Sequence, residues 1–264
     1  DMQVLDPRAY PRILSQGSLG LGEAYMDGWW ECEQLDEFIH RALRANLEAQ
    51  IRVSWYETWQ LLRGLLANLQ SKARAFMVGE QHYDLGNLLY QCMLDSRMTY
   101  TCGYWRNAAD LEQAQASKLD LACRKIGLQS GDRVLDIGCG WGSFAEFAAR
   151  NYGAEVVGIT ISREQAALAR VRCSGLPVEI RLQDYRDVTD GPFDRITSVG
   201  MFEHVGLDHL VAYFTKIRSL LKPDGWAMNH GITSTDAYDG ETRHGGGHFI
   251  DRYVFPQGEL PHIS

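Results

Sequence analysis

The chain has 264 residues, of which 45% are hydrophobic and 23% are charged, and its formal net charge at pH 7 is −8. This composition is typical of a folded protein with one large domain or a domain with a helical appendage, and the acidic balance argues against nucleic acid as a partner. The sequence contains no apolar run of about 18 residues, which argues against a transmembrane helix, and its six cysteines lack a C-x-x-C pair, which favours free thiols in a reducing cytoplasm.

The first part of the chain, residues 1–75, is predicted to form a small helical domain punctuated by glycine. A short helix over 11–16 is expected to stop at Gly17, and Gly20 and Gly22 are expected to break the chain again, because glycine interrupts helices. Apolar side chains at helical spacing predict further helices over residues 35–43 and 55–69. This part is therefore interpreted as an appendage to a larger domain.

Two large aromatic side chains stand next to each other at Trp29 and Trp30. One interpretation places both of them in the core of the small helical domain. The other places them on a surface that touches lipid, since large exposed apolar side chains mark interaction sites. Both interpretations stay open at the level of the sequence.

From residue 76 onward, a second domain is predicted in which helices alternate with strands. Helices are expected over residues 82–94, 111–126, 143–151, 163–173 and 207–221, and strands over residues 134–137, 155–161, 178–182, 193–199 and 225–230. Such alternation implies an α/β fold, with helices on both faces of a parallel sheet. Right-handed crossovers and a reversal after the first strand place the ligand site at the carboxyl ends of the strands.

The central stretch, residues 134–142, is an apolar strand that ends in an acid and alternate glycines. A dinucleotide site would carry G-x-G-x-x-G and an acid after the next strand, whereas this turn has G-x-G-x-G and residues 160–162 supply hydroxyl groups instead. Asp136 before Gly138 and Gly140 fits a turn that binds S-adenosylmethionine (SAM), in which an acid meets the cationic methionine end. SAM is the predicted cofactor, and a turn without a ligand is the alternative.

Two polar residues, Glu203 and His204, come after the fourth predicted strand, and His230 ends the fifth. Because neighbouring parallel strands end at the same edge, Glu203 and His230 are expected to lie beside each other, placed for catalysis. The alternative makes Glu203 a helix cap and His204 a core residue. Cys102 is expected to offer a backbone N–H rather than a nucleophile, because methyl transfer from a sulfonium needs none. His244 and His248 are interpreted as parts of a flexible loop, and no metal site is predicted.

Several short motifs are spread along the chain. They are GSLGLGE at 17–23, DGWW at 27–30, HYDLGN at 82–87, YTCGYW at 100–105, the glycine turn at 134–142, QDYRD at 183–187, MFEHVG at 201–206 and FP at 255–256. In this collinear order they resemble the cyclopropane-fatty-acyl-phospholipid synthases and the related mycolic acid cyclopropane synthases. The resemblance covers nearly the whole chain, and residues 17–30 are similar to the branch that acts on phospholipids.

The resemblance implies a reaction in which SAM and a cis-unsaturated acyl chain give a cyclopropane ring and S-adenosylhomocysteine. It also implies a bound bicarbonate ion as the base. Glu203 would accept the hydroxyl of that ion, His230 would donate to one oxygen, and the backbone N–H groups of Cys102 and Ile232 would complete the cradle. The family also uses a tyrosine from its C-terminal part, which is expected to lie beyond Ser264.

The same resemblance assigns residues to the parts of SAM. Tyr100 and Thr101 are expected near the methionine end with Gly138 and Gly140 under it, Thr160 and Gln165 at the ribose, and Gln183 and Asp184 near the adenine. The amide of Gln165 would then replace the missing ribose acid.

The implied fold is a Rossmann-like class I SAM-dependent methyltransferase sheet with strand order 3-2-1-4-5, carried by residues 76–264. Two closing strands, the sixth and seventh, are expected to be missing, so that the chain is incomplete at its C-terminal end. Residues 1–75 are expected to supply a lipid-binding or dimer surface. The predicted setting is the cytoplasmic face of a phospholipid bilayer, with the protein bound peripherally as a homodimer.

Two other functions remain open from the sequence. The first is another methyltransferase on the same scaffold, acting on a lipid or a small molecule and giving products without a ring. The second is a non-catalytic protein that binds SAM or lipid.

Overall fold

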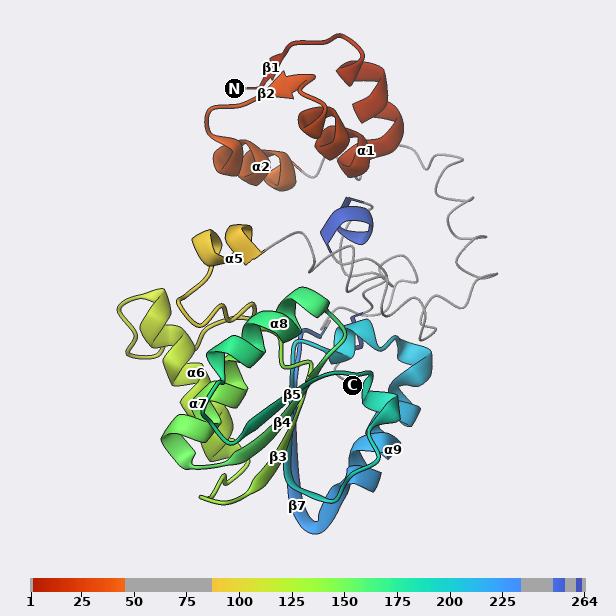
Figure 1. Ribbon diagram of the computed structural model, residues 1–264. Helices are drawn as coiled ribbons and strands as arrows, with labels where there is room; N and C mark the ends of the chain where they lie inside the picture. Colours follow the sequence, from red (N-terminus) through yellow and green to blue (C-terminus); the bar gives the residue numbers. More distant parts are fainter. Residues whose placement is uncertain (1, 46–86, 234–248, 255–259, 263–264) are drawn as a thin grey trace. The chain divides into compact units, whose positions relative to one another are not determined.

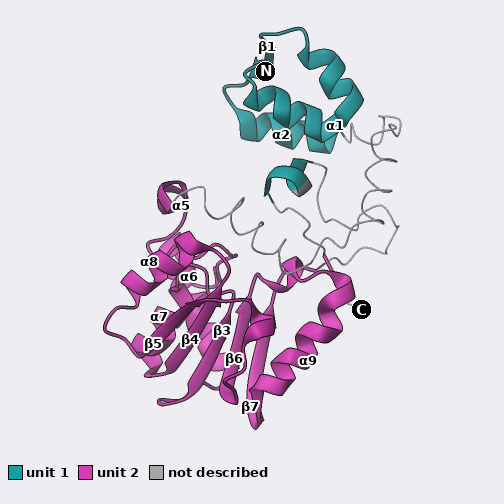
Figure 2. Cartoon of the chain, turned by 45° about the vertical axis from the view of Figure 1, so that its right-hand side comes forward, with its two compact units in different colours: residues 1–69, 239–257 teal, residues 70–238, 258–264 magenta. Residues whose placement is uncertain are grey.

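The computed structural model describes residues 2–45, 87–233, 249–254 and 260–262 (Figure 1). The chain divides into two compact units, residues 1–69 with 239–257, and residues 70–238 with 258–264 (Figure 2). The segment at 239–257 thus groups with the N-terminal unit, although the sequence analysis assigned it to the second domain. The roles predicted for the two parts of the chain stay predictions.

The N-terminal unit contains two helices and a short pair of antiparallel strands among its described residues. Its elements are β1 (Gln3–Val4), α1 (Ala9–Met26), β2 (Trp30–Glu31) and α2 (Leu35–Arg44). The helix predicted over 35–43 is confirmed as α2. The helix predicted over 55–69 lies outside the described residues.

Helix α1 bends at Gly17 but does not end there, so the predicted stop at this residue is a kink. Gly17 has φ 55° and ψ −130°, a conformation that favours glycine. The prediction that Gly20 and Gly22 break the chain is wrong, because both lie within α1. A Cβ at Gly20 would overlap the carbonyl of Arg12, and a Cβ at Gly22 would overlap the ring of Phe249. These two glycines therefore permit close packing.

Trp30 is the centre of the core of the N-terminal unit. Its side chain is 2% exposed, and its indole N–H donates to the carbonyl of Leu21 at 2.9 Å. The indole ring lies 4.9 Å from the ring of Tyr25 and 5.3 Å from that of Phe38. Trp29 beside it is half-buried. The packing of Trp30 agrees with the interpretation of a core anchor.

A short segment from late in the chain packs on α1 within the same unit. This segment is the π-helical turn η6 (Ile250–Val254). The hydroxyl of Tyr253 donates to Glu23 Oε1 at 2.8 Å, and Arg252 Nη1 lies 3.0 Å from the same oxygen. Arg12 forms an ion pair with the other oxygen of Glu23. The buried carboxylate of Glu23 therefore joins η6 to α1.

The second unit is built on a parallel sheet of five strands among the described residues. The strands are β3 (Arg133–Ile137), β4 (Glu155–Thr160), β5 (Val178–Leu182), β6 (Phe193–Val199) and β7 (Leu221–His230). Their order is β5-β4-β3-β6-β7, which confirms the predicted order 3-2-1-4-5. The expectation of two further closing strands stays a prediction.

Helices cover both faces of this sheet (Figure 1). They are α6 (Leu111–Lys125), α7 (Ser143–Tyr152) and α8 (Arg163–Arg172) on one face and α9 (Leu210–Leu220) on the other. The unit also contains α5 (Asn87–Met93) and the 3₁₀ turns η3 (Tyr185–Asp187), η4 (Phe202–His204) and η5 (Leu207–His209). β7 begins at Leu221, four residues before the predicted start, and the helix predicted from 207 begins as the separate turn η5. The first part of the helix predicted over 82–94 lies outside the described residues.

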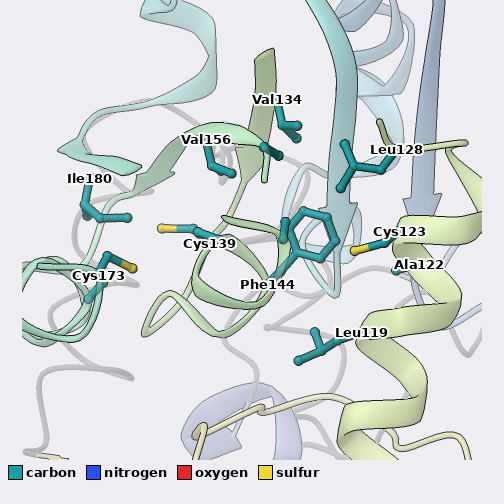
Figure 3. Close-up of a cluster of buried hydrophobic side chains, with 14 of the residues drawn as sticks. Leu119, Ala122, Cys123, Leu128, Val134, Cys139, Phe144, Val156, Cys173 and Ile180 are labelled. Carbon is teal, nitrogen blue, oxygen red and sulfur yellow. The ribbon is translucent and has the colours of Figure 1, made fainter. Parts of the chain in front are cut away.

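The central strand β3 sends alternate side chains to two separate cores. Leu135 and Ile137 join the cluster beneath α9, whereas Val134 joins the cluster formed with α6, α7 and α8 (Figure 3). Successive side chains of a strand point to opposite faces. Asp136 is therefore on the same face of β3 as Val134, the face that α6 covers.

Helix α6 presents a row of buried side chains to the sheet at helical spacing. The row contains Gln115, Leu119, Ala122, Cys123 and Ile126. The helix begins after Asp110, whose carboxylate accepts the N–H of Gln113 at 2.8 Å, a typical N-cap. Of the helices that the structure describes, none is long and apolar enough to cross a bilayer.

Replacing Trp30 by Ala is expected to lower the free energy of unfolding of the N-terminal unit by about 3–5 kcal/mol, because it removes a buried indole and leaves a cavity. Hydrogen exchange followed by mass spectrometry should then show faster exchange across α1 and α2. Leu14→Ala is the control, since the Leu14 side chain is 71% exposed. Unchanged exchange in Trp30→Ala would contradict this packing.

Candidate functional site

The turn after β3 is shaped by glycines in a left-handed conformation. Gly138, Gly140 and Gly142 have φ of 77°, 55° and 84°, a region that other residues rarely adopt. The backbone N–H groups of Gly138 and Cys139 donate to the carbonyl of Ile159 at 3.0 and 2.9 Å. The turn is thereby fixed to the end of β4. A Cβ at Gly140 would meet no atom within 4 Å, and the binding of a ligand at this turn stays a prediction.

Asp136 is a buried carboxylate at the end of β3. It is 2% exposed, and its Oδ1 accepts the hydroxyl of Thr197 at 3.1 Å. Its Oδ2 is buried without a hydrogen-bond partner among the described residues. Burial raises the pKa of Asp136 to about 7. The hydrogen bond from Thr197 and the charge of Lys118 act in the opposite direction and lower this pKa. A carboxylate in this state fits the cationic methionine end of SAM.

The two residues predicted at the ribose lie together at the end of β4. The Thr160 hydroxyl donates to Gln165 Oε1 at 2.8 Å, and both side chains are buried. Ser162 between them caps α8 by accepting the N–H of Gln165 at 3.2 Å. The structure therefore brings Thr160 and Gln165 to one place, and their binding of a ribose stays a prediction.

The two residues predicted near the adenine, Gln183 and Asp184, come directly after β5. Gln183 Nε2 donates to the carbonyl of Asp187 at 3.0 Å. The carboxylate of Asp184 accepts the backbone N–H of Arg186 at 2.9 Å and forms an ion pair with its guanidinium at 2.6 Å. Asp184 thus holds turn η3 in shape, and its contact with an adenine stays a prediction.

Tyr100 is linked to the glycine turn through a buried aromatic cluster. Its ring lies 5.3 Å from that of Tyr90, which lies 4.6 Å from that of Trp141 in the turn. The Trp141 indole donates to Asn87 Oδ1 at 2.7 Å. The predicted methionine-end residues and the glycine turn are therefore parts of one packed assembly.

Thr101 is held at the end of β6 by contacts with α6 and with Gly200. Its carbonyl accepts Gln115 Nε2 at 2.8 Å, and its hydroxyl lies 2.5 Å from Lys118 Nζ, so that α6 provides both partners. A Cβ at Gly200 would come within 2.6 Å of the Thr101 methyl group. Glycine at the end of β6 therefore lets the loop of Thr101 approach the sheet edge.

Glu203 lies in turn η4 and reaches the end of β7. It is 8% exposed, and its Oε1 accepts the backbone N–H of Ile232 at 2.6 Å. Its Oε2 is buried without a hydrogen-bond partner among the described residues. A Cβ at Gly231 would overlap the Phe202 ring and come within 2.8 Å of Glu203 Oε1. Only glycine allows this approach of the two segments.

His230 completes the group of predicted catalytic residues. Its Nε2 lies 3.9 Å from Cys102 Sγ, and its Nδ1 is buried without a hydrogen-bond partner among the described residues. Burial lowers the pKa of His230, as does the charge of Lys118, while Glu203 raises it. The imidazole is therefore neutral at pH 7, with one ring nitrogen that donates and one that accepts.

The structure brings together the four residues predicted for catalysis. Cys102 approaches His230, and Glu203 binds the N–H of Ile232, two residues after His230. Glu203 is used in this cluster and its side chain does not cap α9, whose N-cap is His209. His244 and His248 lie outside the described residues. Among the residues that are described, no group of three His, Cys, Asp or Glu side chains is placed to hold a metal ion.

The sequence analysis missed Lys118, which lies at this site on α6. Its half-buried ammonium contacts Thr101, and burial lowers its pKa to about 8. Its spacing in the sequence could have revealed it. Lys118 is three residues after Gln115 and four before Ala122, so it belongs to the row of α6 that faces the sheet. A lysine in such a row is unusual and indicates a polar contact beneath the helix.

The chain is similar in sequence to known proteins. Residues 70–264 match the family described as mycolic acid cyclopropane synthetase. The chain is 50% identical over 263 residues to the cyclopropane-fatty-acyl-phospholipid synthase of Escherichia coli (strain K12), covering 100% of this chain and 67% of that protein. It is also 50% identical over 267 residues to a probable fatty acid methyltransferase of Pseudomonas putida, covering 99% of this chain and 66% of that protein.

A solved structure extends the likeness to three dimensions. The crystal structure of mycolic acid cyclopropane synthase CmaA1, complexed with S-adenosylhomocysteine (SAH) and CTAB, is similar with a TM-score of 0.65 and 35% identity. The match covers 71% of this chain and 70% of that one. The chain spans about two thirds of the length of the two relatives above.

Replacing Asp136 by Asn is expected to change the pH dependence of stability. The pKa of Asp136 is raised to about 7 from 3.8, so its ionisation destabilises the folded chain as the pH rises through this window. The free energy of unfolding of Asp136→Asn relative to wild type should therefore increase by about 2–3 kcal/mol between pH 5 and pH 8. Urea unfolding at both values measures this difference.

The same variant is expected to bind SAH more weakly in calorimetry, because the cationic methionine end loses its counter-charge. Thr197→Val is the matched control, since it removes only the hydrogen bond to Asp136 and keeps the titration. A stability difference between Asp136→Asn and wild type that does not vary with pH would show that this carboxylate is not the titrating group.

Proposed function

The chain belongs to the mycolic acid cyclopropane synthetase family, and from this premise we propose that it forms cyclopropane rings in unsaturated phospholipid acyl chains with SAM as the one-carbon donor. The observation that carries the proposal is the match over residues 70–264, together with 50% identity to the Escherichia coli synthase over 263 residues. The convergence of Glu203, His230 and Cys102 at the carboxyl ends of the strands supports it.

SAM supplies an electrophilic methyl group on a positively charged sulfur. The residues that fit it are the glycine turn, Asp136 with its unpartnered buried oxygen, and the Thr160 and Gln165 pair. An alkene is a weak nucleophile, so the contribution of the chain at this step is to hold the two reactants close and aligned. The rigid packing of Tyr90, Tyr100 and Trp141 serves that purpose.

The second requirement is a base near the alkene. Attack by the double bond leaves a carbocation on the acyl chain, and ring closure requires the loss of a proton from the new methyl group. We place bicarbonate there, because Glu203 Oε2 and His230 Nδ1 are buried polar atoms that lack a hydrogen-bond partner among the described residues. A small polar ligand with donors and acceptors would satisfy both atoms.

The bicarbonate cradle differs in one respect from the arrangement inferred from the sequence. The backbone N–H of Ile232 donates to Glu203 Oε1 at 2.6 Å, so it is already used. Glu203 would then accept the hydroxyl of the ion through Oε2, which removes the repulsion between two anions. The neutral imidazole of His230 would donate to an oxygen, and the N–H of Ile232 would hold Glu203 in place.

The proposed substrate determines where the protein acts. Phospholipid acyl chains are held in a bilayer, so the protein acts at a bilayer surface, and we propose peripheral binding at the cytoplasmic face. Assembly as a homodimer, with the N-terminal unit at the lipid or dimer surface, is part of the same proposal. The buried position of Trp30 argues that the lipid contact of that unit is made by other residues.

A second product remains a candidate because of one observation. The Pseudomonas putida relative, which shares 50% identity, is named a probable fatty acid methyltransferase. The same first step, followed by loss of a proton from a neighbouring carbon of the acyl chain, keeps the methyl group intact and gives an unsaturated chain with a methyl branch in place of a ring. Both products require a site that aligns the alkene with SAM, and only the ring requires a proton to leave the new methyl group.

Replacing Glu203 by Gln is expected to lower the rate of ring formation at least about 100-fold, because the NH₂ group that replaces Oε2 cannot accept the hydroxyl of the bicarbonate base. The amide oxygen can still accept the N–H of Ile232, so the fold should persist. The assay is mass spectrometry of vesicles of unsaturated phospholipid after incubation with SAM, and SAH binding by calorimetry should change less than about twofold. A twofold change is about 0.4 kcal/mol in binding free energy.

Glu155→Gln is the matched control, because Glu155 is an exposed carboxylate at the opposite end of β4. Ring formation in Glu203→Gln at half the wild-type rate or more would remove Glu203 from the reaction. Wild-type protein that binds SAH but leaves the acyl chains unchanged would refute the proposed function itself.

A further inference from the structure

Lys118 occupies a place on α6 where a charged side chain is costly. It belongs by spacing to the row that packs on the sheet, between Gln115 and Ala122, and its side chain is half-buried. Removal of an ammonium group from water disfavours the charged form. Burial accordingly lowers the pKa of Lys118 to about 8. A partly buried lysine whose pKa is shifted in this way is a candidate for a functional role.

The hydrogen bond between Lys118 and Thr101 indicates part of the role of this lysine. Its Nζ lies 2.5 Å from the hydroxyl of Thr101, and the methyl group of Thr101 packs against Gly200 at the end of β6. Thr101 directly precedes Cys102, whose Sγ is 3.9 Å from His230 Nε2. The ammonium therefore holds the loop that carries Cys102 against the ends of β6 and β7.

The charges around Lys118 leave it without an ion pair of its own among the described residues. Asp95 is paired with Arg97 at 3.6 Å and accepts the N–H of Thr99 at 2.7 Å. Asp136 accepts the hydroxyl of Thr197. Both carboxylates and the thiol of Cys102 raise the pKa of Lys118 without forming a direct contact, and Lys118 in turn lowers the pKa of His230.

We propose that Lys118 is a positioning residue that holds Thr101 and presents a positive charge to a carboxylate-type anion bound beside Cys102 and His230. Two ions of this reaction carry that group, bicarbonate and the methionine end of SAM. The identity of the anion rests on the proposed function, whereas the charge and the contact with Thr101 do not. A bound anion would supply the ion-pair partner that Lys118 lacks among the described residues.

The titration of Lys118 adds a consequence for pH. The ammonium is protonated below a pH of about 8, and a bound anion would raise this pKa further. The groups that face it are Asp95, Asp136 and Cys102, and the nearby imidazole of His230 is under the influence of Glu203 and Lys125. Affinity for the anion should therefore fall as the pH rises above about 8, in wild type but not in Lys118→Arg.

The first test measures the charge through the thiol of Cys102, which is exposed, in a Cys92→Ser background that removes the other exposed cysteine. A nearby positive charge stabilises a thiolate, the form of cysteine that iodoacetamide alkylates, so loss of this charge slows the reaction. Lys118→Gln should therefore be alkylated by iodoacetamide at pH 7.5 about threefold more slowly than the parent. Lys118→Arg should keep the parent rate.

Thr101→Val separates charge from structure, because it removes the hydrogen-bond partner and leaves the ammonium. Its alkylation rate should stay near that of the parent. A loss of rate in Thr101→Val equal to that in Lys118→Gln, or no loss in Lys118→Gln, would overturn the proposal, since a purely structural role or no role would then suffice. Lys118→Arg keeps the test decisive if Lys118→Gln fails to fold.

The second test identifies the anion. If it is bicarbonate, Lys118→Gln should raise the bicarbonate concentration for half-maximal ring formation about tenfold and leave the Kd for SAH within about twofold. If it is the methionine carboxylate, the Kd for SAH in calorimetry should rise about tenfold instead. No change in either quantity would overturn the assignment of an anion. If the wild-type protein forms no ring, the proposed function is refuted. The measurements of SAH binding and of alkylation would still test the role of Lys118.

Discussion

The site depends on the burial of one carboxylate at the carboxyl end of the central strand. Asp136 points from β3 into the face covered by α6, and burial raises its pKa to about 7. The same low-polarity environment lowers the pKa of Lys118 to about 8. The pKa values of both groups therefore lie close to neutral pH, where each group can lose its charge. A ligand with a cationic end and an anionic end would stabilise the charged form of both groups. An amino acid end such as that of SAM has this character.

The region predicted to bind SAM and the residues proposed to hold the base lie at the ends of different strands of the sheet. The glycine turn and Thr160 lie at the ends of β3 and β4, whereas Glu203 and His230 lie at the ends of β6 and β7. The loop of Thr101 and Cys102 connects the two regions, because α6 holds it from one side and Gly200 receives it from the other. In the proposed reaction, the donor and the base would therefore approach the acyl chain from adjacent strand ends, which suits a reaction that forms a bond to carbon and then removes a proton from that carbon.

Features set by periodicity and topology could be predicted from the sequence, whereas features that depend on tertiary contact could not. The strand order and the meeting of Glu203 with the end of β7 are consequences of parallel strands that end at one edge. The helix breaks expected at Gly20 and Gly22 were wrong because Arg12 and Phe249 pack on these glycines, contacts that no local pattern reveals. The grouping of residues 239–257 with the N-terminal unit was invisible for the same reason. Lys118, in contrast, could have been noticed from its spacing on α6.

Closing a ring requires a base held at Glu203 and His230 that removes a proton from the new methyl group, whereas forming a methyl branch does not. SAM carrying a fully deuterated methyl group, incubated with the protein and vesicles of unsaturated phospholipid, tests this most directly by mass spectrometry of the acyl chains. Ring closure removes one deuteron, so we expect products that retain two of the three. Products that retain all three would contradict it, because no proton would then have left the transferred methyl group.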